Sequence, residues 1–279
     1  MVIKRWVMTA SLCMLVAAGY SQTPNYSRLM DEAKAHFDQK EYVQAITCYE
    51  QVLDELKGTE YERLMPAIRN SMAISYLYLG VNALRAKDYA ASKDYLEKAI
   101  ANAKSQSKTY LMANSWMGQW NSVQALAIRT RRGDYEQAVK FSREAERYFD
   151  LAQAPEKRLK EQLARASALE SLSKFDEAET LLCQVMSECE GSQKRSLIMG
   201  KAAYALGGIE RVTERFQQAI VHLEQGYNLC ISNTTAEAKT YARLCAGRLS
   251  LLYSRNIPDA EKESLWKQRA DELKDQSVE

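Results

Sequence analysis

The side chains most able to do chemistry in this chain are two histidines, six cysteines and several closely spaced acidic pairs. His36 and His222 lie in separate segments, and neither has a second ligand at the i+3 or i+4 spacing that zinc sites on helices favour. We therefore expect each histidine to lie on a helix face. The sequence predicts no metal site and no cofactor.

The cysteines are better suited to packing than to chemistry. Five of them follow the N-terminal segment, and an odd number at irregular spacing is weak evidence for a disulfide framework. Cys183 and Cys189 are six residues apart, which places them on opposite sides of a helix. We expect buried, small apolar residues at all five positions, namely Cys48, Cys183, Cys189, Cys230 and Cys245.

Motifs of known catalytic classes are missing from the sequence. There is no G-x-S-x-G nucleophile turn, no phosphate-binding glycine loop and no H-E-x-x-H zinc motif. Acidic pairs such as Glu188 with Glu190 are typical of solvated helix faces. The sequence predicts a protein that is not an enzyme, with a site assembled from distant segments as the alternative that motifs do not detect.

The first residues have the pattern of a secretory signal peptide. Lys4 and Arg5 precede an apolar run of about fourteen residues, and small residues follow it. A membrane span needs roughly 20 apolar residues, so an uncleaved anchor is the less favoured interpretation. We expect a signal peptide over residues 1–21, cleavage before Gln22, no membrane span afterwards, and export to the periplasm or cell surface.

The charge of the mature chain argues against binding to nucleic acid. The whole chain has 38 basic and 36 acidic residues, and cleavage removes two basic residues and no acidic one. The mature chain is then neutral and has no run of clustered Lys and Arg. Affinity for phosphate backbones depends mostly on such clusters, so no nucleic-acid partner is expected.

A repeated pattern organises the rest of the chain. An aromatic residue follows a short polar turn in KEY, KDY, GDY, SKF and ERF, and a degenerate copy is RNI, at intervals of 47, 46, 40, 41 and 41 residues. A small residue comes three positions later in every copy, and further small or apolar residues come seven and ten positions later. These offsets trace one face of a helix. The aligned positions are Tyr42, Tyr89, Tyr135, Phe175, Phe216 and Ile257.

Each repeat is predicted to be a helix, a tight turn and a second helix. One such hairpin cannot bury its own apolar face, whereas stacked neighbours can. The polar last pair is expected to cap the stack, and Pro66 is the one proline that interrupts a predicted helix start. The predicted pairs are 26–39 with 42–56, 62–86 with 89–104, 108–131 with 135–152, 156–172 with 175–190, 194–213 with 216–231, and 236–254 with 259–275.

The aligned residues resemble the tetratricopeptide repeat (TPR) family, most closely at Leu79-Gly80 with Tyr89, Leu96 and Ala99. The likeness covers roughly residues 26–275, although these units are longer than the 34 residues of the family. It implies an all-α solenoid of helix pairs, a right-handed superhelix, over residues 22–279. The family's C-terminal carboxylate clamp is not supported, because Met30 and Lys34 stand where its first Lys and Asn would be.

The resemblance also implies a binding groove lined by the first helix of each pair. Trp120 and the arginines near it have the composition of an anchoring patch, and packing against the adjacent repeat is the alternative role for each of these side chains. The family's groove positions fall on Lys34, Phe37, Leu77, Val81, Leu84, Arg85, Trp120, Val123, Arg131, Lys201, Tyr204 and Arg211.

These features together favour a non-catalytic scaffold in the bacterial cell envelope that binds another protein or peptide. The first alternative is the sensory or regulatory repeat module of a signalling system. A glycan-binding or enzymatic role is the second alternative.

Overall fold

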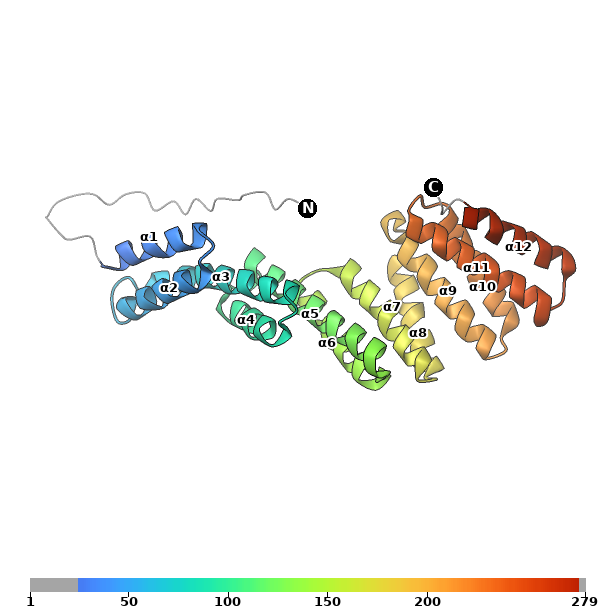
Figure 1. Ribbon diagram of the computed structural model, residues 1–279, viewed down its shortest axis with the longest axis horizontal. Coiled ribbons are helices and arrows are strands. Elements are labelled where there is room, and N and C mark those ends of the chain that lie inside the picture. Colours follow the sequence, from blue (N-terminus) through green and yellow to red (C-terminus); the bar gives the residue numbers. More distant parts are fainter. Residues whose placement is uncertain (1–24, 276–279) are drawn as a thin grey trace. The chain divides into compact units, whose positions relative to one another are not determined.

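The computed structural model describes residues 25–275, and within this range every regular element is a helix (Figure 1). The predicted all-α class is confirmed, because the helices pack as consecutive antiparallel pairs. Within the same range, no helix combines the length and apolar character that crossing a bilayer requires. The predicted signal peptide over residues 1–21 lies outside the described residues.

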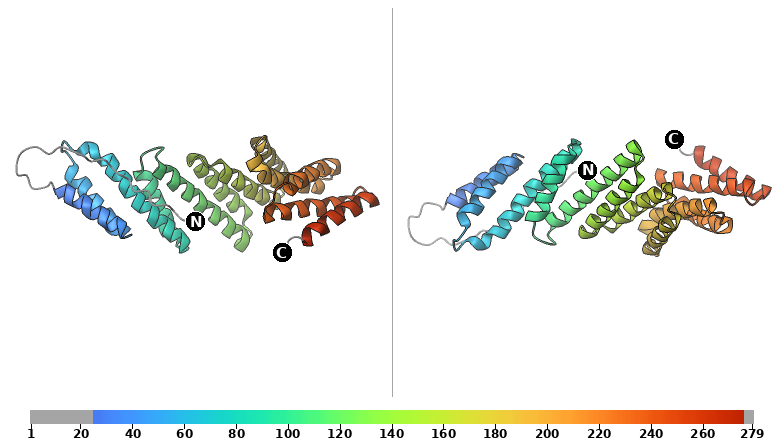
Figure 2. Two further views of the ribbon diagram at one scale, coloured as in Figure 1. Left: turned by 90° about the horizontal axis from the view of Figure 1, so that it is seen from above. Right: turned by 90° about the horizontal axis from the view of Figure 1, so that it is seen from below.

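The chain forms two compact units, and the division falls inside α3, after Ile68. The first unit contains the pair α1 (Asn25–Asp38) and α2 (Tyr42–Leu56), followed by a 3₁₀ turn over Glu62–Leu64. The helices of the second unit follow one another in chain order, and each packs on the next (Figures 1 and 2). They are the part of α3 (Met65–Arg85) from Arg69 onward, α4 (Tyr89–Asn102), α5 (Lys108–Arg132), α6 (Tyr135–Leu151), α7 (Pro155–Ser171), α8 (Phe175–Cys189), α9 (Ser196–Val212), α10 (Phe216–Ile231), α11 (Ala236–Arg255) and α12 (Ala260–Asp275).

The turn that precedes each aromatic residue has the same backbone conformation in five repeats. The first residue of the turn has a positive φ between 57° and 66°. A single residue in this left-handed region is a common way to end a helix. Only one of the five is glycine. In the other four repeats a residue with a Cβ adopts this conformation, which is sterically less favourable for it than for glycine. The residues are Lys40, Lys87, Gly133, Ser173 and Glu214.

Small residues let the paired helices cross closely, as the repeat predicted. A Cβ on Gly80 of α3 would lie 2.8 Å from Leu96 Cγ of α4, and one on Gly207 of α9 would lie 2.5 Å from Leu223 Cγ of α10. The small residue three positions after each aromatic is buried in the first five repeats. Close helix contact therefore depends on these residues, since interiors are packed without spare volume.

The last repeat departs from the predicted register. Helix α12 begins at Ala260, and Ala260 is exposed rather than buried, so the alignment on Ile257 is wrong. Trp266 holds this helix in place instead: it is 5% exposed, and its ring meets that of Tyr227 edge to face at 5.1 Å between centroids. Pro66 lies in the first turn of α3, which begins three residues later than predicted because a 3₁₀ turn precedes it.

Candidate functional site

A row of polar and aromatic side chains follows one face of α9. Lys201, Tyr204, Gly208 and Arg211 are spaced by three, four and three residues, which places them on a single helix face. Lys201, Tyr204 and Arg211 are half-buried, so each keeps part of its surface open to solvent. Three of the predicted groove residues therefore lie together on this face.

Helix α11 supplies the facing side chains. The guanidinium of Arg248 stacks 3.7 Å from the centroid of the Tyr204 ring, and its Nη1 donates to the Tyr204 carbonyl oxygen at 3.0 Å. A Cβ on Gly208 would collide with this guanidinium, so glycine leaves the space that Arg248 occupies. Burial raises the pKa of the Tyr204 hydroxyl, which stays protonated and neutral. We call these residues, with Lys201, Arg211 and Tyr241, the α9–α11 surface.

Tyr241 continues the α9–α11 surface toward the start of α11. Its ring meets that of Tyr204 edge to face at 5.6 Å, and the Lys201 ammonium lies 5.0 Å from its centroid. Lys201 also pairs with the Glu237 carboxylate. These mutual contacts restrict the conformations of the aromatic and cationic side chains on this surface.

An open pocket of about 370 Å³ lies beside Arg248 and runs from α9 across α11 to α12. Gly247 is exposed on α11, and a Cβ there would meet no atom within 4 Å. The missing side chain leaves the opening. We call this the Gly247 pocket, and it is lined by Tyr204, Arg243, Leu244, Gly247, Arg248, Leu251, Ala270, Asp271 and Lys274.

Four of the other predicted groove residues lie inside the second unit. Trp120 is 9% exposed: its Nε1 donates to the Tyr89 carbonyl oxygen at 2.8 Å, and its ring packs against Phe141 with 6.1 Å between centroids. Its indole is thus engaged in the core, which agrees with the packing alternative rather than with an anchoring patch. The same core cluster buries Leu77, Val81 and Leu84.

The remaining predicted residues are more accessible. Arg85 and Arg131 are exposed near the C-terminal ends of α3 and α5, and Val123 is half-buried in the middle of α5. In the first unit Lys34 is exposed, and Phe37 meets Tyr42 edge to face at 5.5 Å between ring centroids. Within the second unit, Arg85 and Arg131 lie at exposed helix ends rather than in the buried cluster that contains Trp120.

A buried polar layer between α5, α6 and α7 has no counterpart in the sequence predictions. Glu161 is 7% exposed and accepts hydrogen bonds from the hydroxyls of Ser122 and Ser142, each at 2.6 Å. Nearby, Glu146 and Arg165 form an ion pair at 2.6 Å. Burial raises the pKa of Glu146 to about 7, although Arg165 opposes the shift. The sequence analysis did not single out Glu161, because its two hydroxyl partners come from different helices far away in the sequence.

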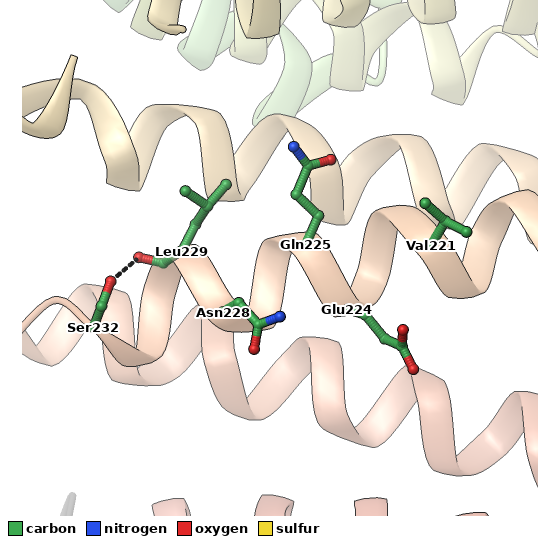
Figure 3. Close-up of a pocket in the computed structure, with 6 residues that line it drawn as sticks. All are labelled: Val221, Glu224, Gln225, Asn228, Leu229 and Ser232. Atoms are coloured by element: carbon green, nitrogen blue, oxygen red, sulfur yellow. Dashed lines mark hydrogen bonds between the residues drawn. The ribbon is translucent and has the colours of Figure 1, made fainter. Parts of the chain in front are cut away.

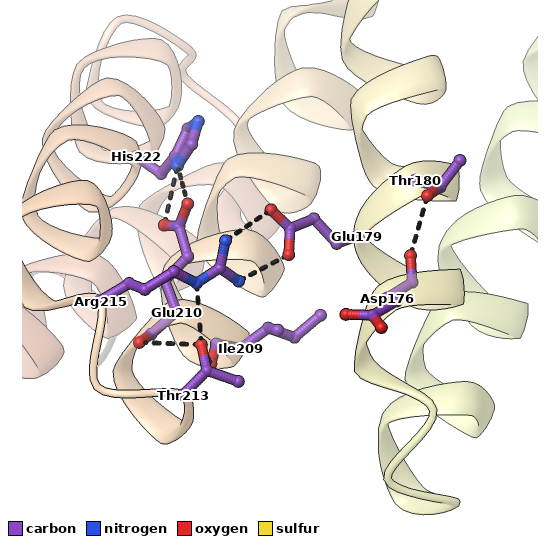
Figure 4. A network of polar contacts seen from close by, with 8 residues as sticks. All are labelled: Asp176, Glu179, Thr180, Ile209, Glu210, Thr213, Arg215 and His222. Atoms are coloured by element: carbon purple, nitrogen blue, oxygen red, sulfur yellow. Dashed lines mark hydrogen bonds and ion pairs between the residues drawn. The ribbon is translucent and has the colours of Figure 1, made fainter.

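A second polar network joins α8, α9 and α10 (Figure 4). Glu210 is 2% exposed, and its two carboxylate oxygens lie 2.9 and 2.8 Å from His222 Nδ1. Arg215 forms a bidentate pair with Glu179 across to α8, at 2.8 and 2.5 Å, and this bonding lowers the pKa of Glu179. His222 lies on a helix face as predicted, and its partner is a buried carboxylate.

The five cysteines in the described residues are thiols without disulfide partners. Four are buried as predicted, while Cys183 is exposed, so the prediction is wrong at that position. Burial raises the pKa of Cys230 to about 11 and that of Cys245 to about 12, which leaves both thiols protonated and unreactive at neutral pH. Within residues 25–275, no three potential ligands gather into a metal site.

A broader hollow lies on α10 (Figure 3). Its volume is about 510 Å³, but its lining residues come only from α10 and from Ser232, which directly follows that helix. It therefore lacks the opposing walls of the Gly247 pocket, and only one of its lining side chains is charged. The residues are Val221, Glu224, Gln225, Asn228, Leu229 and Ser232.

Comparison with known proteins supports the fold and goes no further. No protein-family model and no curated protein sequence matches the chain. The crystal structure of BtubC (BKLC) from P. vanneervenii is similar, with a TM-score of 0.53, 13% identity, and a match over 90% of this chain and 92% of that one.

Two further structures are more distant. The C-terminal part of a TPR repeat-containing protein from Cytophaga hutchinsonii gives a TM-score of 0.40 at 16% identity, over 88% of this chain and 95% of that one. The TPR2AB domain of yeast Sti1, in a complex with pHSP90, gives a TM-score of 0.36 at 13% identity, over 80% of this chain and 98% of that one. The chain has an all-α fold of packed antiparallel helix pairs, similar over most of its length to that of BtubC.

Proposed function

We propose that this chain is a non-catalytic scaffold that binds another protein or peptide through its α9–α11 surface, outside the cytoplasm. The observation that carries the proposal is the Gly247 pocket, which opens beside an ordered set of tyrosine and arginine side chains. Tyr and Arg are enriched among the residues that dominate binding energy in protein interfaces. Their arrangement here suits recognition rather than catalysis.

The pocket has the form expected for a side chain of a larger partner. Its volume lies within the range of ligand sites, about 300–1,000 Å³. It is open along α11 rather than enclosed, so a bound chain can enter and leave along the surface. The buried carboxylates Glu161 and Glu210 are engaged by serine hydroxyls and by His222 within the interior, and they do not line this pocket.

Capture of a partner with three baits tests the binding surface. The wild-type chain, Gly247→Trp and Val221→Trp are each immobilised and exposed to an envelope fraction, and retained proteins are identified by mass spectrometry. Val221 is 62% exposed on α10, the second helix of its pair, whereas Gly247 lies on α11, the first helix of the next pair. Val221→Trp is therefore the matched control for an exposed tryptophan away from the pocket. We expect a protein that the wild type and Val221→Trp retain and that Gly247→Trp loses. The reverse pattern would move the surface to the second helices of the pairs.

The proposed location rests on the N-terminal sequence and has its own test. A fusion of residues 1–30 to a reporter that is active only outside the cytoplasm should give signal, and the mature chain should begin at or near Gln22. Leu15→Asp, which breaks the apolar run, should abolish the signal. A soluble protein that retains Met1 would contradict export without affecting the binding proposal.

A further inference from the structure

More of the charged side chains that line the Gly247 pocket are positive than negative. Arg243, Arg248 and Lys274 are cationic, and Asp271 is the one acidic residue that lines it. An open pocket with two more positive than negative side chains favours an anionic partner through electrostatic complementarity.

The two arginines retain the capacity to bind an anion. Among the described residues, Arg243 takes part in no ion pair or hydrogen bond, although it lines the pocket. Arg248 donates from Nη1 to the Tyr204 carbonyl oxygen. A guanidinium has five N–H donors in a planar fork, so most of those of Arg248 remain for a carboxylate of a partner.

The pocket also has an apolar part. Leu244 and Leu251 lie one turn before and one turn after Gly247 on α11, and Ala270 faces them from α12. An aliphatic side chain can lie on Gly247 between the two leucines while a neighbouring carboxylate reaches Arg243 or Arg248. A bare phosphate or a nucleic-acid backbone would leave this apolar surface exposed to water.

We infer that the Gly247 pocket binds a peptide segment in which an aliphatic side chain is flanked by acidic residues. This inference rests on the proposed function and adds the chemistry of the partner. The aliphatic side chain supplies burial, the carboxylates supply charge complementarity, and Tyr204 with its stacked arginine forms the wall against which the segment lies.

Three synthetic peptides of one length test this chemistry by fluorescence polarisation. In the first, leucine is flanked by glutamates; in the second, glutamines replace the glutamates; in the third, serine replaces the leucine. We expect the first to bind, and the second and third to bind about tenfold or more weakly. Its affinity should fall by about tenfold between low salt and ~0.5 M salt, because exposed charges are screened.

Variants of α11 assign the binding to the pocket. Gly247→Trp fills the opening and Arg243→Glu reverses a charge, and each should weaken the first peptide about tenfold or more. Arg255→Glu makes the same charge change at an exposed position of α11 that does not line the pocket, so binding should stay within about twofold. Circular dichroism verifies that each variant is folded.

The outcomes separate this inference from the proposed function. Equal binding of the glutamate and glutamine peptides, or no binding of the first up to about 1 mM, would overturn the acidic-segment inference. If a captured protein is still lost in Gly247→Trp, the proposed function stands with a different ligand. A dimer of the wild-type chain that Gly247→Trp abolishes would identify a second copy as the occupant and would also overturn the inference.

Discussion

The core around Trp120 and the α9–α11 surface both contain predicted groove positions of the first helices, yet only the second is open to solvent. Around Trp120, α6 of the same repeat contributes Phe141, whose ring packs edge to face against the indole, and the Tyr89 carbonyl of the preceding repeat accepts its N–H. On α11, Gly247 contributes no side chain, so Tyr204 keeps an accessible side. The helices packed around a groove position, rather than the position itself, decide whether its residue becomes core or surface.

The largest expected effect is a difference in stability between a substitution in the core around Trp120 and one on the α9–α11 surface. Trp120→Ala removes a buried indole and its hydrogen bond to the Tyr89 carbonyl oxygen, so it should lower the free energy of unfolding by about 3–5 kcal/mol. Tyr204→Ala, at a half-buried position, should cost clearly less while it weakens partner binding. Urea denaturation of both variants measures the difference. An unchanged midpoint for Trp120→Ala would mean that its ring is available to a partner after all.

Two glycines on first helices provide the next test. Gly80→Leu should destabilise the fold by about 1–3 kcal/mol, because the Cβ alone would lie 2.8 Å from Leu96 Cγ. Gly247→Leu has open space and replaces a helical glycine, so it should be neutral or stabilise by up to about 1 kcal/mol. Thermal melting of the pair measures this contrast. Equal losses would place Gly247 in a packed interface.

The buried layer near Trp120 should respond to pH. The pKa of Glu146 is about 7 in the folded chain and lower when unfolded, so the unfolded chain loses this proton first as pH rises. The stability contributed by the protonated form is present below about pH 4.5 and is lost as pH rises through about 7.

The measurement is the difference in unfolding free energy between the wild type and Glu146→Gln. From pH 5 to pH 8 the wild type should lose on the order of 1–2 kcal/mol relative to the variant. Glu144→Gln, at an exposed position on the same helix, is the control. A difference that stays constant with pH would show that Glu146 remains ionised beside Arg165.

The smallest effect on stability is expected at Gly208. An alanine Cβ would displace the Arg248 guanidinium, which is the end of a flexible side chain, while alanine favours the helix by about 1 kcal/mol. Net stability should therefore change by less than about 1 kcal/mol. Binding of the acidic peptide should weaken, because Arg248 no longer stacks on Tyr204. Unchanged binding would remove Arg248 from the account.

Helix positions could be predicted because, in each repeat, the aromatic residue after the turn and the small residues at fixed offsets from it mark both the turn and the packed face of the second helix. The aromatic residues at Tyr42, Tyr89, Tyr135, Phe175 and Phe216 each begin the second helix of a pair, as the repeat predicted. The last pair escaped this reasoning: α12 begins at Ala260, and its packing depends on Trp266 rather than on an aromatic at the turn.

The site was less accessible to sequence reasoning. Lys201, Tyr204 and Arg211 could be placed on one face from their spacing, but that spacing does not show which neighbouring helix covers them. In the sequence, Trp120 and the arginines near it have the composition of a protein interface. The burial of Trp120 depends on Phe141 from the next helix, which the sequence pattern does not show. The opening at Gly247 depends on side chains from three helices, so no local pattern reveals it.

Site-specific photo-cross-linking tests the central claim most directly. A benzoylphenylalanine residue replaces Asp271, which lines the Gly247 pocket from α12, or Arg85 on α3, or Val221 on α10, in three otherwise identical full-length chains expressed in cells. The opening at Gly247 is unchanged in all three chains, and each probe position is exposed in the structure. The account predicts a discrete cross-linked partner at position 271 and none at 85 or 221. A partner captured at 85 or 221 but not at 271 would contradict it.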